Sequence, residues 1–226
     1  SECRSLTTTA LYSNGTWLMM LPTLFVGGTL YVMNGFDPRS FIDLVEKVRI
    51  THTFLVPPQF SSILELDTLN KHSFSSLKTI LCAGSPLRMD IKKNILENIS
   101  ENLFELYGFS EGFATMLKPN YQKKKIGSVG TPVLGFEIKI IDEKGSECPP
   151  NVAGEIAGYG AGMMKEYFGE RELTEELIWT DKRGRSFIKS GDIGSLDEDG
   201  FLTILDRKKD MIISGGLNVF PVDIEE

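Results

Sequence analysis

The chain has few residues that could hold a structural metal or build a disulfide framework. Its 226 residues include three cysteines and two histidines, and no C-x-x-C pair occurs. Zinc sites use Cys and His at short repeated spacings, and disulfide-stapled domains carry paired cysteines. Both classes of protein are therefore disfavoured. The pattern indicates a reducing compartment, and we expect a cytoplasmic protein.

The sequence also lacks an excess of positive charge. It has 24 Lys and Arg against 31 Asp and Glu, a net charge of −7. Proteins that bind nucleic acid along a broad surface need excess basic residues to neutralise phosphates. The only basic run, Lys123–Lys125, is short and typical of a solvated turn. A nucleic-acid partner is not expected.

No long hydrophobic run is unbroken. The most apolar stretch, Trp17–Met33, approaches the length of a membrane span, but Pro22, Gly27 and Gly28 interrupt its middle. This pattern favours a buried helix, a glycine turn and a buried strand over a membrane span.

Strand and helix signals alternate through the first half. Strands are expected at 28–33, 52–56, 77–84 and 103–108, and helices at 37–50, 59–66 and 89–99. Strand–helix–strand repetition predicts an α/β fold with a parallel sheet, whose ligands bind beyond the carboxyl ends of the strands.

The pattern changes after about residue 125. Short strands are expected at 136–142, 154–160, 191–197 and 200–206, the last two joined by a turn at Asp199–Gly200. Such spacing favours a small antiparallel, barrel-like sheet. We therefore expect an α/β part at 1–125, a β-rich part at 126–206, and a hinge with the start of a truncated further domain at 207–226.

The stretch LYGFSEG, 106–112, carries several chemical groups at the end of an expected strand. Tyr107 offers a flat face to a base, and Gly108 allows close approach to the backbone. Ser110 could donate to a phosphate, and Glu111 could bind Mg²⁺, which prefers carboxylate oxygens. The alternative is a surface turn with a capping serine and a solvated glutamate.

Two further stretches have both a plain and a functional interpretation. In IKSGDIG, 188–194, Asp192 could accept hydrogen bonds from a ribose diol, although Gly-Asp is also an ordinary turn. CAGSP, 82–86, could lie against a planar ring or be a tight turn. Arg207 could bind near a sugar or be solvated in a linker.

Taken together and in order, these stretches resemble the adenylate-forming superfamily, and most closely its acyl-CoA synthetase branch. The resemblance rests on AGSPL at 83–87, LYGFSE at 106–111, GSVGTPVLGFEIKIID at 127–142, GEI at 154–156, MMKEYFGERELT at 163–174, SGDIG at 190–194 and DRKKDMIISGGLNVFPVDIEE at 206–226. It implies an acetyl-CoA synthetase-like fold, of which this chain is a fragment of the N-terminal domain.

The resemblance implies an AMP-forming acid–thiol ligase. A fatty or aryl carboxylic acid would react with ATP to give an acyl-adenylate, and coenzyme A would displace AMP. Implied cofactors and partners are ATP or AMP, Mg²⁺, coenzyme A and the acid; the oligomeric state is left open.

The resemblance also assigns roles to individual residues. Ser110 and Glu111 would act at the phosphates, with Glu111 holding Mg²⁺, and Asp192 with Arg207 would bind the ribose. Lys209 would be the hinge between the two steps. The adenine would lie against Ala83, Gly84, Ser85, Tyr107 and Gly108, and the acyl pocket would include Val56, Pro57 and Phe109.

Three departures from the family pattern stand out. The glycine- and Ser/Thr-rich phosphate loop ending in lysine is absent, as is the C-terminal domain with its lysine, and Ser13 stands where many members have histidine. The chain alone is therefore expected to be inactive.

Other functions remain open at this stage. The parent protein could load a carrier-protein thiol, or act as an oxygenase of the luciferase type. It could also be a non-catalytic AMP-binding relic, or a plain α/β domain that binds no nucleotide.

Overall fold

The computed structural model describes residues 2–67, 69–208, 212–214 and 217–219. The described residues form two compact units, one within Ser1–Leu106 and Leu117–Ile126 and the other within Tyr107–Met116 and Gly127–Glu226. The division falls inside β5 (Leu103–Gly108) and β6 (Ala114–Leu117), so the tip of this hairpin belongs to the second unit. Most of the expected hinge segment, 207–226, lies outside the described residues.

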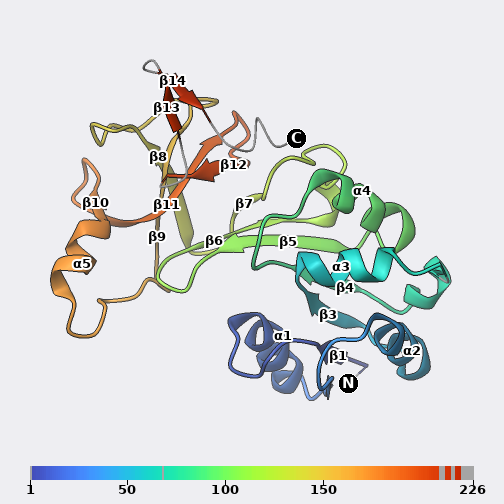
Figure 1. Cartoon of the computed structure of the whole chain (residues 1–226). Helices are drawn as coiled ribbons and strands as arrows, with labels where there is room; N and C mark the ends of the chain where they lie inside the picture. The colour runs from blue at the N-terminus through green and yellow to red at the C-terminus, as the bar shows by residue number, and fades with distance from the viewer. Residues whose placement is uncertain (1, 68, 209–211, 215–216, 220–226) are drawn as a thin grey trace. The chain divides into compact units, whose positions relative to one another are not determined.

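The first unit is a parallel sheet with helical connections (Figure 1). Its strands run in the order β2-β1-β3-β4-β5, and each pair is parallel. The strands are β1 (Arg4–Thr7), β2 (Thr29–Val32), β3 (His52–Leu55), β4 (Thr79–Cys82) and β5. The connecting helices are α1 (Asn14–Phe25), α2 (Pro38–Val48), α3 (Pro57–Leu64) and α4 (Met89–Asn98). Short 3₁₀ turns lie at Lys71–Phe74 and Pro119–Tyr121. The expected α/β class is confirmed.

Helix α2 shows how local sequence sets element boundaries. Asp37 caps its start by accepting a hydrogen bond from the Ser40 N–H at 2.7 Å. The helix ends where Arg49 turns left-handed, at φ 53°. Its buried face consists of Phe41 and Val45, as the helical spacing predicts.

Helix α3 begins earlier than the expected residue 59. Its first residue is Pro57, whose fixed φ and missing N–H suit the first turn of a helix. The side chain of Gln59 accepts the free N–H of Val56 at 3.1 Å and completes the cap. The two prolines therefore start this helix rather than only ending the preceding strand.

Strand β1 was not expected from the sequence. Its residues Ser5 and Thr7 are fully buried between two neighbouring strands, where apolar residues are usual. The hydroxyl of Ser5 lies 2.6 Å from that of Thr23, and the hydroxyl of Thr7 lies 2.9 Å from that of Thr16. Helix α1 thus supplies the hydrogen-bond partners that make a hydroxyl-rich central strand stable.

The apolar stretch at 17–33 forms the expected helix, turn and strand, as most of α1, a turn at Gly27 and strand β2. The expected burial is wrong, because α1 buries only Thr16 and Thr23 and β2 has no buried residue. No helix among the described residues is both long and apolar enough to cross a membrane.

The second unit is an antiparallel sheet, also as expected. Its order is β10-β11-β9-β8, with β12 pairing on β11. These strands are β8 (Phe136–Ile141), β9 (Gly154–Gly160), β10 (Ile178–Thr180), β11 (Ser186–Leu196) and β12 (Leu202–Arg207). The short helix α5 (Arg171–Leu177) precedes β10, and β13 (Ile212–Ser214) pairs with β14 (Leu217–Val219) as a separate two-stranded sheet. Strands β6 and β7 (Thr131–Pro132) pair antiparallel with each other and follow β5 in the strand order of the parallel sheet.

The core of the second unit forms around Phe113, which is 2% exposed. Its ring occupies the space above Gly158 of β9, where an added Cβ would lie 1.9 Å from the ring. Ile156 and Ile188 complete the same buried cluster. This packing holds the β5–β6 hairpin tip against the sheet that carries Asp192.

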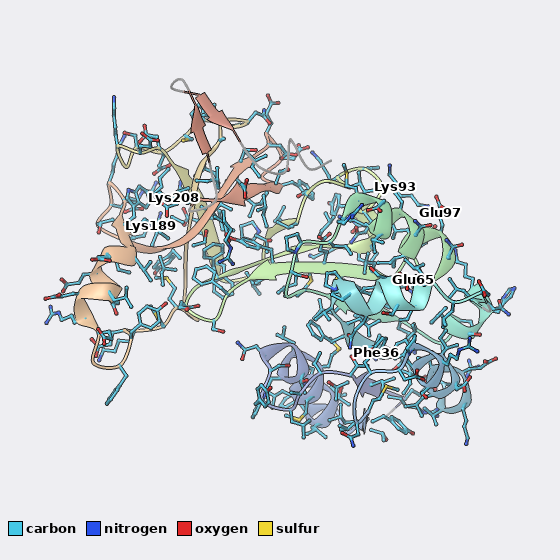
Figure 2. The ribbon with its side chains drawn as sticks, viewed as in Figure 1. Phe36, Glu65, Lys93, Glu97, Lys189 and Lys208 are labelled. Carbon is cyan, nitrogen blue, oxygen red and sulfur yellow. The ribbon has the colours of Figure 1, made fainter. Side chains whose placement is uncertain are left out.

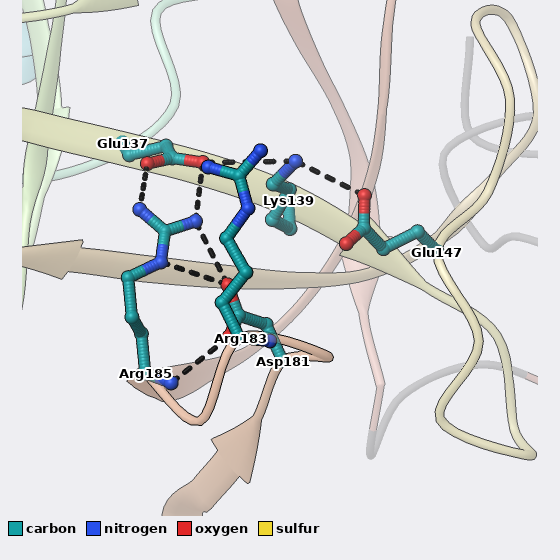
Figure 3. Close-up of polar contacts among 6 residues, drawn as sticks. All are labelled: Glu137, Lys139, Glu147, Asp181, Arg183 and Arg185. Atoms are coloured by element: carbon teal, nitrogen blue, oxygen red, sulfur yellow. Dashed lines mark hydrogen bonds and ion pairs between the residues drawn. The ribbon is translucent and has the colours of Figure 1, made fainter.

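An ion-pair network lies on the same sheet (Figure 3). The guanidinium of Arg185 makes a two-pronged contact with Glu137 at 2.6 and 3.1 Å, and its Nε donates to Asp181 at 2.8 Å. The same group lies 5.2 Å from the ring centre of Phe187. The network ties the β10–β11 turn to β8.

Replacing Arg185 with methionine should lower the melting temperature at neutral pH. The hydrogen bond from Arg185 is the main reason that the pKa of Glu137 lies below its ordinary value of 4.5. A lowered folded-state pKa stabilises the fold above pH 4.5, and this contribution is lost as the pH falls through the lowered value. The difference in melting temperature should therefore shrink below that pH.

Thermal unfolding between pH 3 and 8 tests this expectation. The control is Lys182→Met, which changes an exposed side chain in the same turn. If the difference in melting temperature between Arg185→Met and wild type is the same at every pH, the ion pair with Glu137 is not the cause of the destabilisation.

Candidate functional site

The LYGFSEG stretch forms the loop at the tip of the β5–β6 hairpin. Gly108 ends β5, and a Cβ there would lie 2.5 Å from the carbonyl oxygen of Phe113, so a larger residue does not fit. Phe109 packs edge-on against Phe113, with ring centres 5.2 Å apart. These contacts leave Ser110 exposed and Glu111 half-buried.

Asp192 occupies an irregular point of strand β11. Gly191, just before it, has φ +74°, a conformation that favours glycine. The pairing of β11 with β9 shifts register between Lys189 and Ile193. The Asp192 N–H donates to the Ser190 hydroxyl at 3.0 Å, and its side chain is largely buried.

Three side chains that are distant in sequence converge within the second unit. The Tyr107 hydroxyl donates to Oδ2 of Asp192 at 2.6 Å, across 85 residues. The Nε of Arg207 lies 3.2 Å from Oδ1 of the same carboxylate. Asp192 and Arg207 are direct partners in the β11–β12 ladder, which explains their meeting.

The electrostatics of this cluster keep Tyr107 a hydrogen-bond donor. Burial raises the pKa of Tyr107 well above its usual range, and its hydrogen bond to Asp192 raises it further. Tyr107 therefore remains a donor, and Arg207 balances the charge of Asp192. A carboxylate has about four lone-pair directions, so Asp192 can still accept from a ligand diol.

Glu111 is held by a segment to which the sequence assigned no role. The Tyr167 hydroxyl donates to Oε1 of Glu111 at 2.8 Å, and the Met164 N–H donates to its backbone carbonyl at 2.8 Å. Tyr167 was visible in the sequence only as part of MMKEYFGERELT. Its contact with Glu111 is a tertiary one, and spacing alone carries no signal for it.

The donor set near Glu111 fits one mode of magnesium binding. Within the described part of the chain there is no group of three or more His, Cys, Asp or Glu side chains that could hold a metal ion. Mg²⁺ is commonly held by one or two carboxylates together with substrate phosphates, rather than in an all-protein cage. A single carboxylate at an exposed loop suits that arrangement.

The expected residues of the first unit lie at the carboxyl ends of β3 and β4. Val56 and Pro57 start α3, and Pro57 is buried. Ala83 to Ser85 follow β4, with Gly84 at φ +101°. A Cβ on Gly84 would lie 3.5 Å from Cγ1 of Val56, so the two turns are neighbours. The expected hinge residue Lys209 lies outside the described residues.

Comparison with known proteins identifies the family of this chain. The model of the family described as "AMP-binding enzyme" matches residues 2–168. The chain belongs to the AMP-binding enzyme family. The adenylate-forming resemblance is thereby confirmed.

Individual members of the AMP-binding family resemble the chain along nearly all of its length. Feruloyl-CoA synthase of Amycolatopsis is 34% identical over 92% of this chain, and 2-succinylbenzoate–CoA ligase of Bacillus pumilus is 33% identical over 95%. Among solved structures, the amide bond synthetase McbA of Marinactinospora thermotolerans aligns with a TM-score of 0.89 and 28% identity over 99% of this chain. O-succinylbenzoate coenzyme A synthetase of Bacillus subtilis, in complex with ATP and magnesium ion, aligns with a TM-score of 0.85 and 30% identity over 100% of this chain.

The chain spans less than half the length of these AMP-binding relatives. It covers 42% of the feruloyl-CoA synthase, 45% of the Bacillus pumilus ligase and 46% of each of the two solved chains.

Proposed function

We propose that the protein to which this chain belongs activates a carboxylic acid with ATP and transfers the acyl group to coenzyme A. The observation that carries the proposal is the cluster of Tyr107, Asp192 and Arg207, in a chain whose curated relatives are CoA ligases.

The chemistry explains why a nucleotide is needed. A carboxylate is a poor electrophile, because its charge repels nucleophiles and oxide is a poor leaving group. Its oxygen attacks the α-phosphorus of ATP, the bond to pyrophosphate breaks, and an acyl-adenylate forms. The coenzyme A thiol then gives up its proton, attacks the acyl carbon and displaces AMP.

Two contacts, of Tyr107 and of Arg207 with Asp192, support the roles that we propose for the second unit. Asp192 accepts both ribose hydroxyls, with Arg207 beside it, and the Tyr107 ring stacks on adenine while its hydroxyl orients the carboxylate. Ser110 donates to the α-phosphate. When bound at Glu111, Mg²⁺ offsets phosphate charge as it is attacked.

For the first unit, we propose that the turn of Ala83, Gly84 and Ser85 binds adenine and that Val56 and Pro57 contact the acyl group. For the second unit, we propose that Gly108 lets the nucleotide approach the backbone and that Phe109 contacts the acyl group. Lys209 is the proposed hinge.

The acceptor of the acyl group has a second candidate. McbA, which aligns with a TM-score of 0.89, is described as an amide bond synthetase, so an amine could take the place of the thiol. The acid-activating half-reaction is the same for both acceptors.

Pyrophosphate release tests the proposal. The full-length parent is incubated with ATP, Mg²⁺ and a panel of fatty and aryl acids, and products with coenzyme A or amines are identified by mass spectrometry. We expect acid-dependent pyrophosphate release and a CoA thioester, and no release from the 226-residue chain alone. AMP binding without pyrophosphate release from the parent would indicate a non-catalytic relic and contradict the proposal.

A further inference from the structure

The segment 163–167 bonds to Glu111 at two points. Its Met164 N–H donates to the backbone carbonyl of Glu111, and its Tyr167 hydroxyl donates to the carboxylate, both at 2.8 Å. One contact therefore sets the position of the residue in the loop, and the other sets the direction of its carboxylate.

The backbone of Tyr167 is fixed by a hydrogen bond to helix α5. Its N–H donates to the Thr174 hydroxyl at 2.9 Å, and that hydroxyl donates to the Glu170 carbonyl at 3.0 Å. Thr174 is 7% exposed and lies on α5. Tyr167 is therefore fixed at its backbone by a buried residue of α5 and at its hydroxyl by the carboxylate of Glu111.

The hydrogen bond from Tyr167 uses only one oxygen of the Glu111 carboxylate, so the carboxylate can still bind a cation. Tyr167 contacts Oε1 of Glu111. A half-buried glutamate on a loop would otherwise sample several rotamers, and the donor selects one of them.

We propose that Tyr167 is a positioning residue for Glu111, holding its carboxylate in the orientation that binds the divalent cation of the nucleotide complex. This inference rests on the proposed function, in which Glu111 is the protein ligand of that cation. The tyrosine does not contact the reacting atoms and acts through the glutamate.

The test compares Tyr167→Phe with Tyr159→Phe in the full-length parent. Tyr159 lies on β9 of the same unit, and its ring packs against Phe187 and Arg185. For Y167F the Mg²⁺ concentration that gives half-maximal pyrophosphate release should rise about tenfold, the low end of the effect of losing one hydrogen bond to a charged group. At saturating Mg²⁺ the rate should stay within about twofold of wild type, because excess cation compensates. Y159F should match wild type throughout.

A binding measurement separates this inference from the proposed function. Mn²⁺ binding by electron paramagnetic resonance, with a non-hydrolysable ATP analogue, should weaken for Y167F by the same factor. An unchanged Mn²⁺ affinity, or an equal loss of rate at every Mg²⁺ concentration, would overturn the positioning role. A wild-type parent that binds Mn²⁺ with the analogue but releases no pyrophosphate would refute the proposed function alone.

Discussion

Alanine in place of Asp192 is expected to lower kcat/KM for ATP in the parent protein by about 10²- to 10⁴-fold. Hydrogen bonds to a charged group contribute roughly 1.5–3 kcal/mol each, and the proposed ribose contact involves two of them. The carboxylate is also the common partner of Tyr107 and Arg207, so its removal takes an acceptor away from both donors. Steady-state kinetics of pyrophosphate release, with ATP varied, measures the effect.

Tyr107→Phe is the matched variant for the Asp192 prediction. It keeps the aromatic face and removes only the hydroxyl that donates to Asp192 at 2.6 Å. The loss should be about tenfold, in keeping with one hydrogen bond to a carboxylate. The melting temperature of D192A shows whether the variant is folded. If folded D192A has the same kcat/KM for ATP as wild type, the nucleotide binds elsewhere and the prediction is wrong.

Methionine in place of Lys92 is expected to destabilise the protein by about 3–5 kcal/mol, the usual result of breaking a buried ion pair from one side. Lys92 is 1% exposed and Glu105 is 7% exposed. The Lys92 ammonium donates at 2.6 Å both to Glu105 Oε2 and to the Ile126 carbonyl. Without it, the carboxylate of β5 stays buried with no counter-charge. Burial already raises the pKa of Glu105.

Urea unfolding measures the Lys92 effect against two controls. Lys93→Met changes the next residue of α4, which is exposed at the surface (Figure 2), and should shift stability by less than about 0.5 kcal/mol. The double variant K92M/E105L removes both charges and should recover most of the loss, because a buried pair replaced by apolar groups is often close to neutral. A K92M protein as stable as K93M would show that the pair does not stabilise the fold.

Part of the fold could be predicted because its determinants are local. Asp37 and Pro38 mark the start of α2, and the spacing of Phe41 and Val45 identifies its buried face. Strand β1 could not be predicted in this way. The hydroxyls of Ser5 and Thr7 are stable in the sheet only because α1 places threonines opposite them.

The candidate site likewise has a part that local sequence predicts and a part that depends on tertiary contacts. Its motifs contain the residue types that bind a nucleotide. The order of these motifs along the chain identified the family. The contacts of Tyr167 with Glu111, and of Lys92 with Glu105, join segments that no local pattern connects.

The sequence by itself therefore determined the alternation of strands and helices in the first half, the antiparallel strands in the second, and the AMP-binding family. Propensity, capping and hydrophobic periodicity act over a few residues, and all three can be read along the chain. Only the tertiary structure decided which donors each carboxylate meets. Asp192 meets Tyr107 across 85 residues because strand pairing and the packing of Phe113 bring β5 and β11 together.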